Sequence, residues 1–166
     1  MVGVLLARQR VKRGVGRPIR FEASEEGFIA IMKTLEHIKD FINDVTDWAS
    51  AQPDIRAVAL VGSYARNAAT GTSDIDLVIL TDEPVKYLEN TEWVRQFGHV
   101  ARQQTEPYGK VTSLRVWYIG GREVEYGITT PDWAAQPLDE GTQRVVRDGM
   151  KVLFERQVLL GPYLKA

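Results

Sequence analysis

The stretch that decides the fold is Val61-Gly-Ser-Tyr-Ala-Arg-Asn-Ala-Ala-Thr-Gly-Thr-Ser-Asp-Ile-Asp-Leu77. It continues a short apolar run, 56–61, which is typical of a buried strand. A short helix is predicted to begin at once, over 62–68, and residues 69–73 are turn-forming. Residues 74–80 predict a second strand. This order of elements sets a Gly-Ser turn beside a pair of acidic residues.

The acidic pair consists of Asp74 and Asp76. Side chains alternate along a strand, so these two point to one face while Ile75 and Leu77 point into the core. Two carboxylates so close repel each other unless a positive charge lies between them. Magnesium ions prefer oxygen ligands, and two of them about 3.5–4 Å apart bind both oxygens of an in-line displacement at phosphorus. The pair therefore predicts a site for two Mg²⁺ ions.

Gly62-Ser63 supplies a complementary group for an anion. A strand-to-helix junction offers free backbone N–H groups to a phosphate. Glycine permits close approach of the backbone, and the Ser63 hydroxyl is a further donor. Arg66 lies one turn further on, where it either reaches the same triphosphate or is a surface arginine.

A third carboxylate would complete the metal ligands and help to deprotonate an acceptor hydroxyl. Residues 111–119 and 123–129 are rich in β-branched and aromatic side chains, and Gly120-Gly121 between them predicts a hairpin. We assign the third acid to Glu125 on the second strand of this hairpin. Glu123 faces the same side and is the alternative.

The other predicted elements form the scaffold around these residues. Apolar residues at three- and four-residue spacing predict a helix over 24–51, with Ser24 as its N-cap. Further helices are predicted over 85–104 and 142–150, and a closing strand over 151–154. Trp48, Trp93 and Trp117 are interpreted as core residues.

Composition limits the class of protein. The chain has 166 residues, no cysteine and a net charge of -1. Residues 1–21 hold six of the 21 basic groups and no acid, so the remainder carries 15 basic and 22 acidic groups, a charge of about -7. Such a body repels nucleic-acid backbones. No apolar run reaches the roughly 20 residues that span a membrane. We expect a disordered basic extension over 1–22, one domain over 23–166, and a cytoplasmic location.

The quoted motif resembles the DNA polymerase beta-like nucleotidyltransferase superfamily, especially its small prokaryotic members, the antibiotic nucleotidyltransferases and minimal nucleotidyltransferase antitoxins. The resemblance covers about residues 57–80, and Asn67 stands where many relatives have glycine. It implies an α+β palm, a mixed β-sheet with flanking helices. It also implies phosphate binding by Gly62-Ser63, metal binding by Asp74 and Asp76, and a third acid on a neighbouring strand, which we map to Glu125.

The expected activity is a metal-dependent transfer of a nucleoside monophosphate from an NTP, with ATP the first choice, to a hydroxyl group. Pyrophosphate would be released. The acceptor is either a small molecule or a protein, and nucleic acid and membrane are disfavoured as partners. The alternative is a catalytically silent module that binds a nucleotide or a partner on the same scaffold. A partner protein or a homodimer stays open.

Overall fold

The computed structural model describes residues 24–70 and 72–164. The expected basic extension over 1–22 lies outside the described residues. The chain divides into two compact units, Met1–Asp40 and Phe41–Ala166. The predicted functional residues all belong to the second unit.

The first long element is helix α1 (Glu25–Ser50), close to its predicted bounds. Ser24 Oγ accepts a hydrogen bond from the backbone N–H of Gly27 at 3.1 Å, which is the N-cap that the sequence predicts. The part of α1 in the second unit buries Phe41, Val45 and Ala49.

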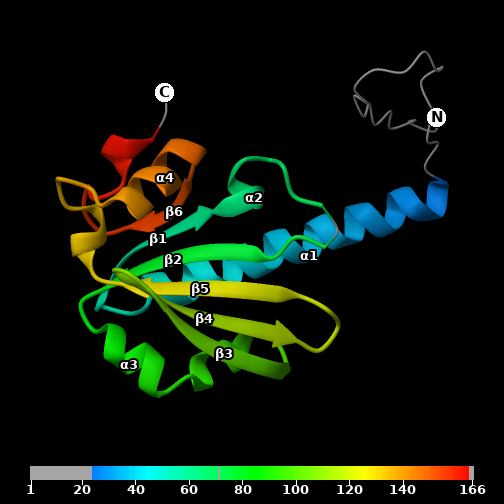
Figure 1. The fold of residues 1–166 in the computed structure, drawn as a ribbon. Helices are drawn as coiled ribbons and strands as arrows, with labels where there is room; N and C mark the ends of the chain where they lie inside the picture. The colour runs from blue at the N-terminus through cyan, green and yellow to red at the C-terminus, as the bar shows by residue number, and fades with distance from the viewer. Residues whose placement is uncertain (1–23, 71, 165–166) are drawn as a thin grey trace, which may run out of the picture. The chain divides into compact units, whose positions relative to one another are not determined.

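Six strands form one mixed sheet in the order β3-β4-β5-β2-β1-β6 (Figure 1). Their bounds are β1 (Ile55–Val61), β2 (Ile75–Thr81), β3 (Val100–Tyr108), β4 (Val111–Tyr118), β5 (Glu123–Thr129) and β6 (Lys151–Glu155). All neighbours are antiparallel except β2 and β5, which are parallel. The predicted α+β class with a mixed sheet is confirmed.

One face of the sheet carries an aromatic core. Tyr126 on β5 is fully buried and lies edge-on to Phe41, with ring centroids 6.5 Å apart. The rings of Trp48 and Trp93 stack at 4.8 Å, in keeping with their predicted place in the core. Alternation along the strands sends Asp76 and Glu125 to the other face, which we call the acidic face.

The acidic face is covered only in part. Trp133 and Met150 pack with Val78 and Leu80 into a second apolar cluster on this side of the sheet. The covering elements are η2 (Pro131–Ala134), α4 (Glu140–Asp148) and η3 (Gly161–Tyr163). Trp117 also lies on this face, by its alternation with buried Val116 and Tyr118. Its prediction as a core residue was wrong.

The predicted helix over 85–104 was also wrong. That stretch forms a short helix, α3 (Pro84–Glu89), a 3-10 helix, η1 (Glu92–Phe97), and then most of β3. Gly98, with φ +154°, ends η1. The helix α2 (Gly62–Ala65) is likewise shorter than the predicted 62–68. Helix α4 and strand β6 lie within two residues of the expected bounds.

A buried pair of tyrosines joins η1 to the sheet. Tyr118 Oη donates to the carbonyl of Val94 at 2.8 Å and lies 2.8 Å from the hydroxyl of Tyr126. Burial raises the pKa of Tyr118 to about 12, so both groups stay neutral.

We expect Tyr118→Phe to lower the free energy of unfolding by about 1–3 kcal/mol, because Val94 O and Tyr126 Oη each lose a buried partner. Urea denaturation measures the change. Tyr108→Phe is the matched control, since Tyr108 is exposed, its hydroxyl contacts Glu106, and its removal should cost little. Equal losses in the two variants would contradict this role of the pair.

Candidate active site

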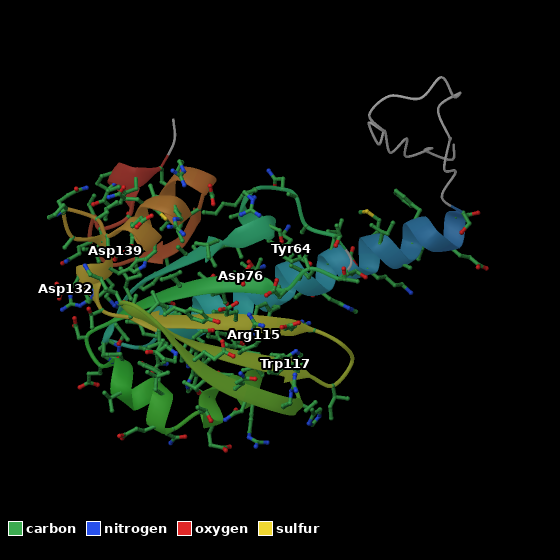
Figure 2. The ribbon with its side chains drawn as sticks, viewed as in Figure 1. Tyr64, Asp76, Arg115, Trp117, Asp132 and Asp139 are labelled. Atoms are coloured by element: carbon green, nitrogen blue, oxygen red, sulfur yellow. The ribbon has the colours of Figure 1, made fainter. Side chains whose placement is uncertain are left out.

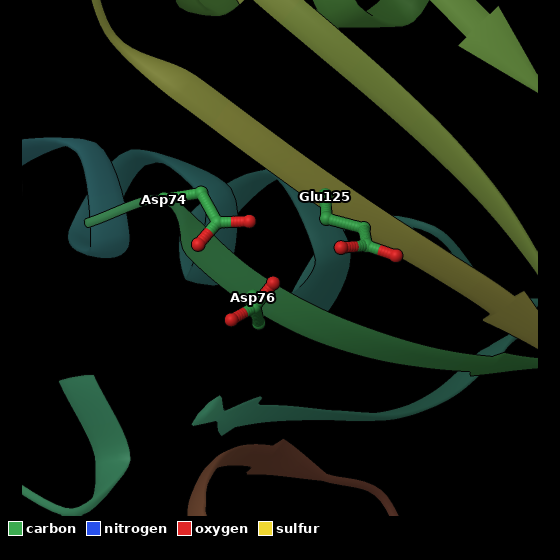
Figure 3. Close-up of side chains that lie close together, drawn as sticks. All are labelled: Asp74, Asp76 and Glu125. Carbon is green, nitrogen blue, oxygen red and sulfur yellow. The ribbon is translucent and has the colours of Figure 1, made fainter. Parts of the chain in front are cut away.

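Three carboxylates converge on the acidic face. Asp74, Asp76 and Glu125 each contribute an oxygen, and these oxygens all lie within 4.8 Å of one another. Asp74 directly precedes β2, Asp76 lies on β2 and Glu125 on β5, and Figure 3 shows the three side chains turned toward a common point. The cluster can hold a divalent cation, because hard cations prefer oxygen ligands.

The parallel pairing of β2 with β5 positions the third acid. Asp76 is directly opposite Glu125 in the register, so the two side chains emerge next to each other on one face. Glu123, the alternative third acid, is two residues earlier on β5 and lies 3.6 Å from Arg115 in an ion pair. Among the described residues, only Glu125 joins the aspartates in a cluster of this kind.

Two side chains of β4 hold Glu125 in place. Ser113 Oγ donates to one carboxylate oxygen at 2.8 Å, and Arg115 donates to the other at 3.0 Å. Ser113 is buried, and Arg115 lies directly opposite Glu125 in the β4–β5 register. The hydrogen bond to Glu125 raises the pKa of Arg115, which stays charged. Both oxygens of Glu125 are therefore fixed in orientation.

Asp76 is the most perturbed acid. Burial, followed by the charges of Asp74 and Glu125, raises the pKa of Asp76 from 3.8 to about 7. A cation among the three carboxylates would offset their mutual repulsion. A carboxyl group whose pKa is raised this far by burial and by neighbouring acids is typical of a functional site.

The stability of the metal-free protein should therefore depend on pH. The folded state holds the proton of Asp76 more tightly than the unfolded chain, so this stabilisation is complete below about pH 4 and is lost as the pH rises through about 7. After discounting for partial exposure we expect a loss of roughly 1–3 kcal/mol. Denaturation in EDTA from pH 4 to 8 measures it, and Asp76→Asn should flatten the slope. An unchanged slope in that variant would assign the effect to other groups.

Gly62 makes room for Asp76. Its φ is +69°, and a Cβ placed on it would lie 2.1 Å from Asp76 Oδ2. A side chain at this position would therefore push into the carboxylate cluster. Ser63 follows in α2, and the charge of Asp74 adds to burial in raising the pKa of Tyr64, so Tyr64 lies on the same side as the acids.

A cavity of about 870 Å³ lies against the cluster. Its lining includes Gly62, Arg66 and Asp76, together with Trp133 of η2 and Thr142 of α4. Figure 2 shows Asp76 near the middle of the sheet, with Asp132 and Asp139 toward the η2 and α4 side. The volume is within the range of about 300–1,000 Å³ of small-molecule sites. Arg66 is thus placed at the cavity with Gly62, whereas Ser63 and Asp74 are not among its lining residues.

Sequence reasoning missed several parts of this site. Ser113 and the α4 wall of the cavity carry no motif, because their positions depend on pairings between distant segments. Arg115 alternates with Ser113 along the predicted strand, so the two share a face, but alternation alone does not identify that face as the one with the acids.

A mixed sheet that sets a Gly-Ser turn beside three acids on neighbouring strands defines a class of nucleotide-transfer domains. The chain belongs to the nucleotidyltransferase domain family, whose model matches residues 38–120. The match includes Gly62, Ser63, Asp74 and Asp76, whereas Glu125 lies beyond it.

Relatives from Methanocaldococcus jannaschii share this part of the chain. "Putative protein adenylyltransferase MJ0126" is 39% identical over 61 residues, which are 37% of this chain and 62% of the relative. A second relative with the same descriptive name, MJ1379, is 34% identical over 70 residues, 39% of this chain and 70% of the relative. The chain spans about three fifths of the length of the first of these relatives.

Solved structures show more distant likeness. An aminoglycoside 6-adenyltransferase from Bacillus subtilis has a TM-score of 0.43 and 19% identity, and the match covers 53% of this chain and 33% of that one. The polymerase core of TRAMP, an RNA surveillance complex, has a TM-score of 0.40 and 14% identity, with 63% and 32% covered. Within the described residues, no helix is long and apolar enough to cross a membrane.

Proposed function

We propose that this chain transfers a nucleoside monophosphate from a nucleoside triphosphate, ATP by preference, to a hydroxyl group on a protein. The observation that carries the proposal is the convergence of oxygens from Asp74, Asp76 and Glu125 within 4.8 Å of one another. Gly62 lies so close to Asp76 that a side chain there would collide with its carboxylate. The choice of ATP and of a protein acceptor is supported by the names of the relatives.

Each end of the site has a distinct task in this proposal. Gly62 and Ser63 bind the β- and γ-phosphates, with Arg66 beside them. The nucleoside occupies the cavity between the acidic face and α4, against the buried ring of Trp133. Asp74, Asp76 and Glu125 fit magnesium, because their converging carboxylates are the ligands this cation prefers. When bound, two such ions supply charge stabilisation at the phosphorus.

The reaction exchanges one bond to phosphorus for another. The acceptor oxygen forms a bond to the α-phosphorus, the bond to the bridging oxygen breaks, and pyrophosphate leaves. Glu125 takes the proton of the acceptor hydroxyl, since Ser113 and Arg115 hold its carboxylate in one orientation. Its place on β5, away from the Gly-Ser turn, suits a group that acts on the attacking oxygen.

The test is transfer of label from α-³²P-ATP in Mg²⁺, with GTP, CTP and UTP as comparisons. Acceptors are cell extract, a peptide panel and an aminoglycoside panel. Label on protein that disappears in Asp74→Asn and Asp76→Asn supports the proposal. Label on an aminoglycoside alone would move the acceptor to small molecules. Nucleotide binding without transfer, unchanged in both variants, would identify a silent binding module instead.

A further inference from the structure

The acidic face continues beyond Glu125 over strands β4 and β3. The cavity reaches the ends of these strands at Tyr108, Val111 and Ser113, but Arg102, Arg115 and Trp117 are not among its lining residues.

A row of directly paired residues crosses the sheet and connects the Gly-Ser turn at the end of β1 with the surface over β4 and β3. Val61, just before the Gly-Ser turn, is opposite Asp76, which is opposite Glu125. Glu125 is opposite Arg115, and Arg115 is opposite Gln104 on β3. The row thus runs from the phosphate-binding turn to the edge strand.

In-line displacement gives this row a direction. The attacking and leaving oxygens lie on opposite sides of the phosphorus. If the leaving pyrophosphate is held at Gly62-Ser63, at the β1 end, the attacking oxygen arrives from the β5 end over Glu125. The remainder of the acceptor then extends over β4 and β3.

The surface in that direction offers a fixed guanidinium. Arg102 on β3 lies over the ring of Trp117 on β4, with its guanidinium carbon 3.9 Å from the ring centroid. Figure 2 shows Trp117 next to Arg115 on the same side of the sheet. Stacking on an indole orients a guanidinium but leaves its N–H donors free at the edge. Arg102 is exposed, so those donors face solvent.

The two arginines on this surface differ in charge balance. Arg115 is paired with Glu125 at 3.0 Å and with Glu123 at 3.6 Å. Arg102 forms no ion pair with any carboxylate in the part of the chain that the structure describes. Arg102 is therefore a guanidinium without a carboxylate partner, held over Trp117 two strands away from β5.

We infer that Arg102 and Trp117 bind an acidic segment of the acceptor polypeptide and that Arg102 accepts its carboxylate. The inference rests on the proposed function. Arg102 is two strands away from Glu125 and two residues along, which corresponds to roughly 12 Å between backbone positions. Three to four residues of extended chain span that distance. The acceptor therefore carries an Asp or Glu three or four positions from the modified hydroxyl.

A nucleic acid fits this surface less well. Binding a phosphate backbone needs several cations along a track, and here Arg115 is already balanced by two glutamates. The chain as a whole also carries a net charge of -1. A single carboxylate needs only the one guanidinium that is available.

The experiment uses the full chain with Mg²⁺, labelled ATP and 13-residue peptides. Each peptide carries one Tyr, Ser or Thr, with Asp, Asn or Lys three or four positions away, and a single-stranded oligonucleotide is the comparison. Arg102→Gln should raise the KM for Asp peptides about tenfold to a hundredfold and leave the KM for ATP unchanged. Trp117→Phe should retain most of the activity, and Trp117→Ala should resemble Arg102→Gln.

Arg95→Gln is the matched control, because Arg95 is an exposed arginine on η1 that pairs with Glu92. Its KM for every peptide should equal that of the unmodified chain. Equal labelling of Asp, Asn and Lys peptides, preference for the oligonucleotide, or an Arg102→Gln variant without effect would each overturn the inference. If no acceptor is labelled although the chain binds ATP, and Asp76→Asn abolishes that binding, the inference is overturned while the nucleotide site stands. Absence of ATP binding would instead overturn the proposed function.

Discussion

Gly62→Ala is expected to reduce nucleotide transfer at least about a hundredfold. The new methyl carbon would lie 2.1 Å from Asp76 Oδ2, closer than any two such atoms approach. Either the Gly-Ser turn or the carboxylate must move, and a displacement of about 1 Å in a catalytic group costs on the order of a hundredfold in rate. The positive φ of +69° adds strain for any residue with a side chain. Label transfer at saturating ATP measures the loss.

Gly121→Ala is the control that separates backbone strain at a positive φ from the collision of a side chain with Asp76. Gly121 has φ +99°, but a Cβ there would meet nothing within 4 Å. Both Gly62→Ala and Gly121→Ala should lose stability in urea, because both glycines have a positive φ, but Gly121→Ala should keep its transfer activity. If Gly62→Ala retained activity with normal folding, Asp76 would not be required where the structure places it.

Asp76→Asn is expected to abolish transfer while stabilising the protein in the absence of metal. Removing this charge relieves the cost of burial and the repulsion from Asp74 and Glu125, which together raise the pKa of Asp76 to about 7. Above pH 7 the metal-free variant should gain roughly 1–3 kcal/mol, because no buried charge must form. Transfer should fall by about 10²–10⁴-fold, since metal ions supply several kcal/mol of transition-state stabilisation. Thermal melts with and without Mg²⁺, beside the transfer assay, measure both effects.

The control for this variant is Asp82→Asn. Asp82 directly follows β2 and pairs with Arg56 at the surface, outside the carboxylate cluster. Its activity and its melting temperature in EDTA should stay close to those of the unmodified chain. A loss of activity in Asp76→Asn that came with lower stability would indicate unfolding rather than loss of a ligand.

The central part of the fold could be predicted because its determinants are local. The apolar run of β1, the glycine after it and the alternation that begins at Asp74 lie within about 25 residues, and each has its own physical signature. The choice of Glu125 over Glu123, by contrast, depends on a pairing between distant strands. Alternation puts both on one face, and only the parallel register with β2 brings Glu125 opposite Asp76.

The remainder was not predictable because its signals are weak or distant. Strand β3 is exposed along most of its length, so it lacks the alternation of apolar and polar residues that identifies a half-buried strand. The apolar residues of α3 and η1 before it have helical spacing and extended the predicted helix too far. Trp117 was interpreted as a core residue, although alternation puts it on the same face as Arg115, and it pairs directly with Glu123.

The parallel pairing of β2 with β5 has a consequence for how such proteins can diverge. The two strands that carry the acids are separated by about forty residues of chain, yet their hydrogen bonds alone determine that Asp76 meets Glu125. Insertions in α3, in η1 or in the turn between β3 and β4 leave this register untouched. Changes in those segments can therefore alter the exposed surface over β3 and β4 without moving Asp76 away from Glu125.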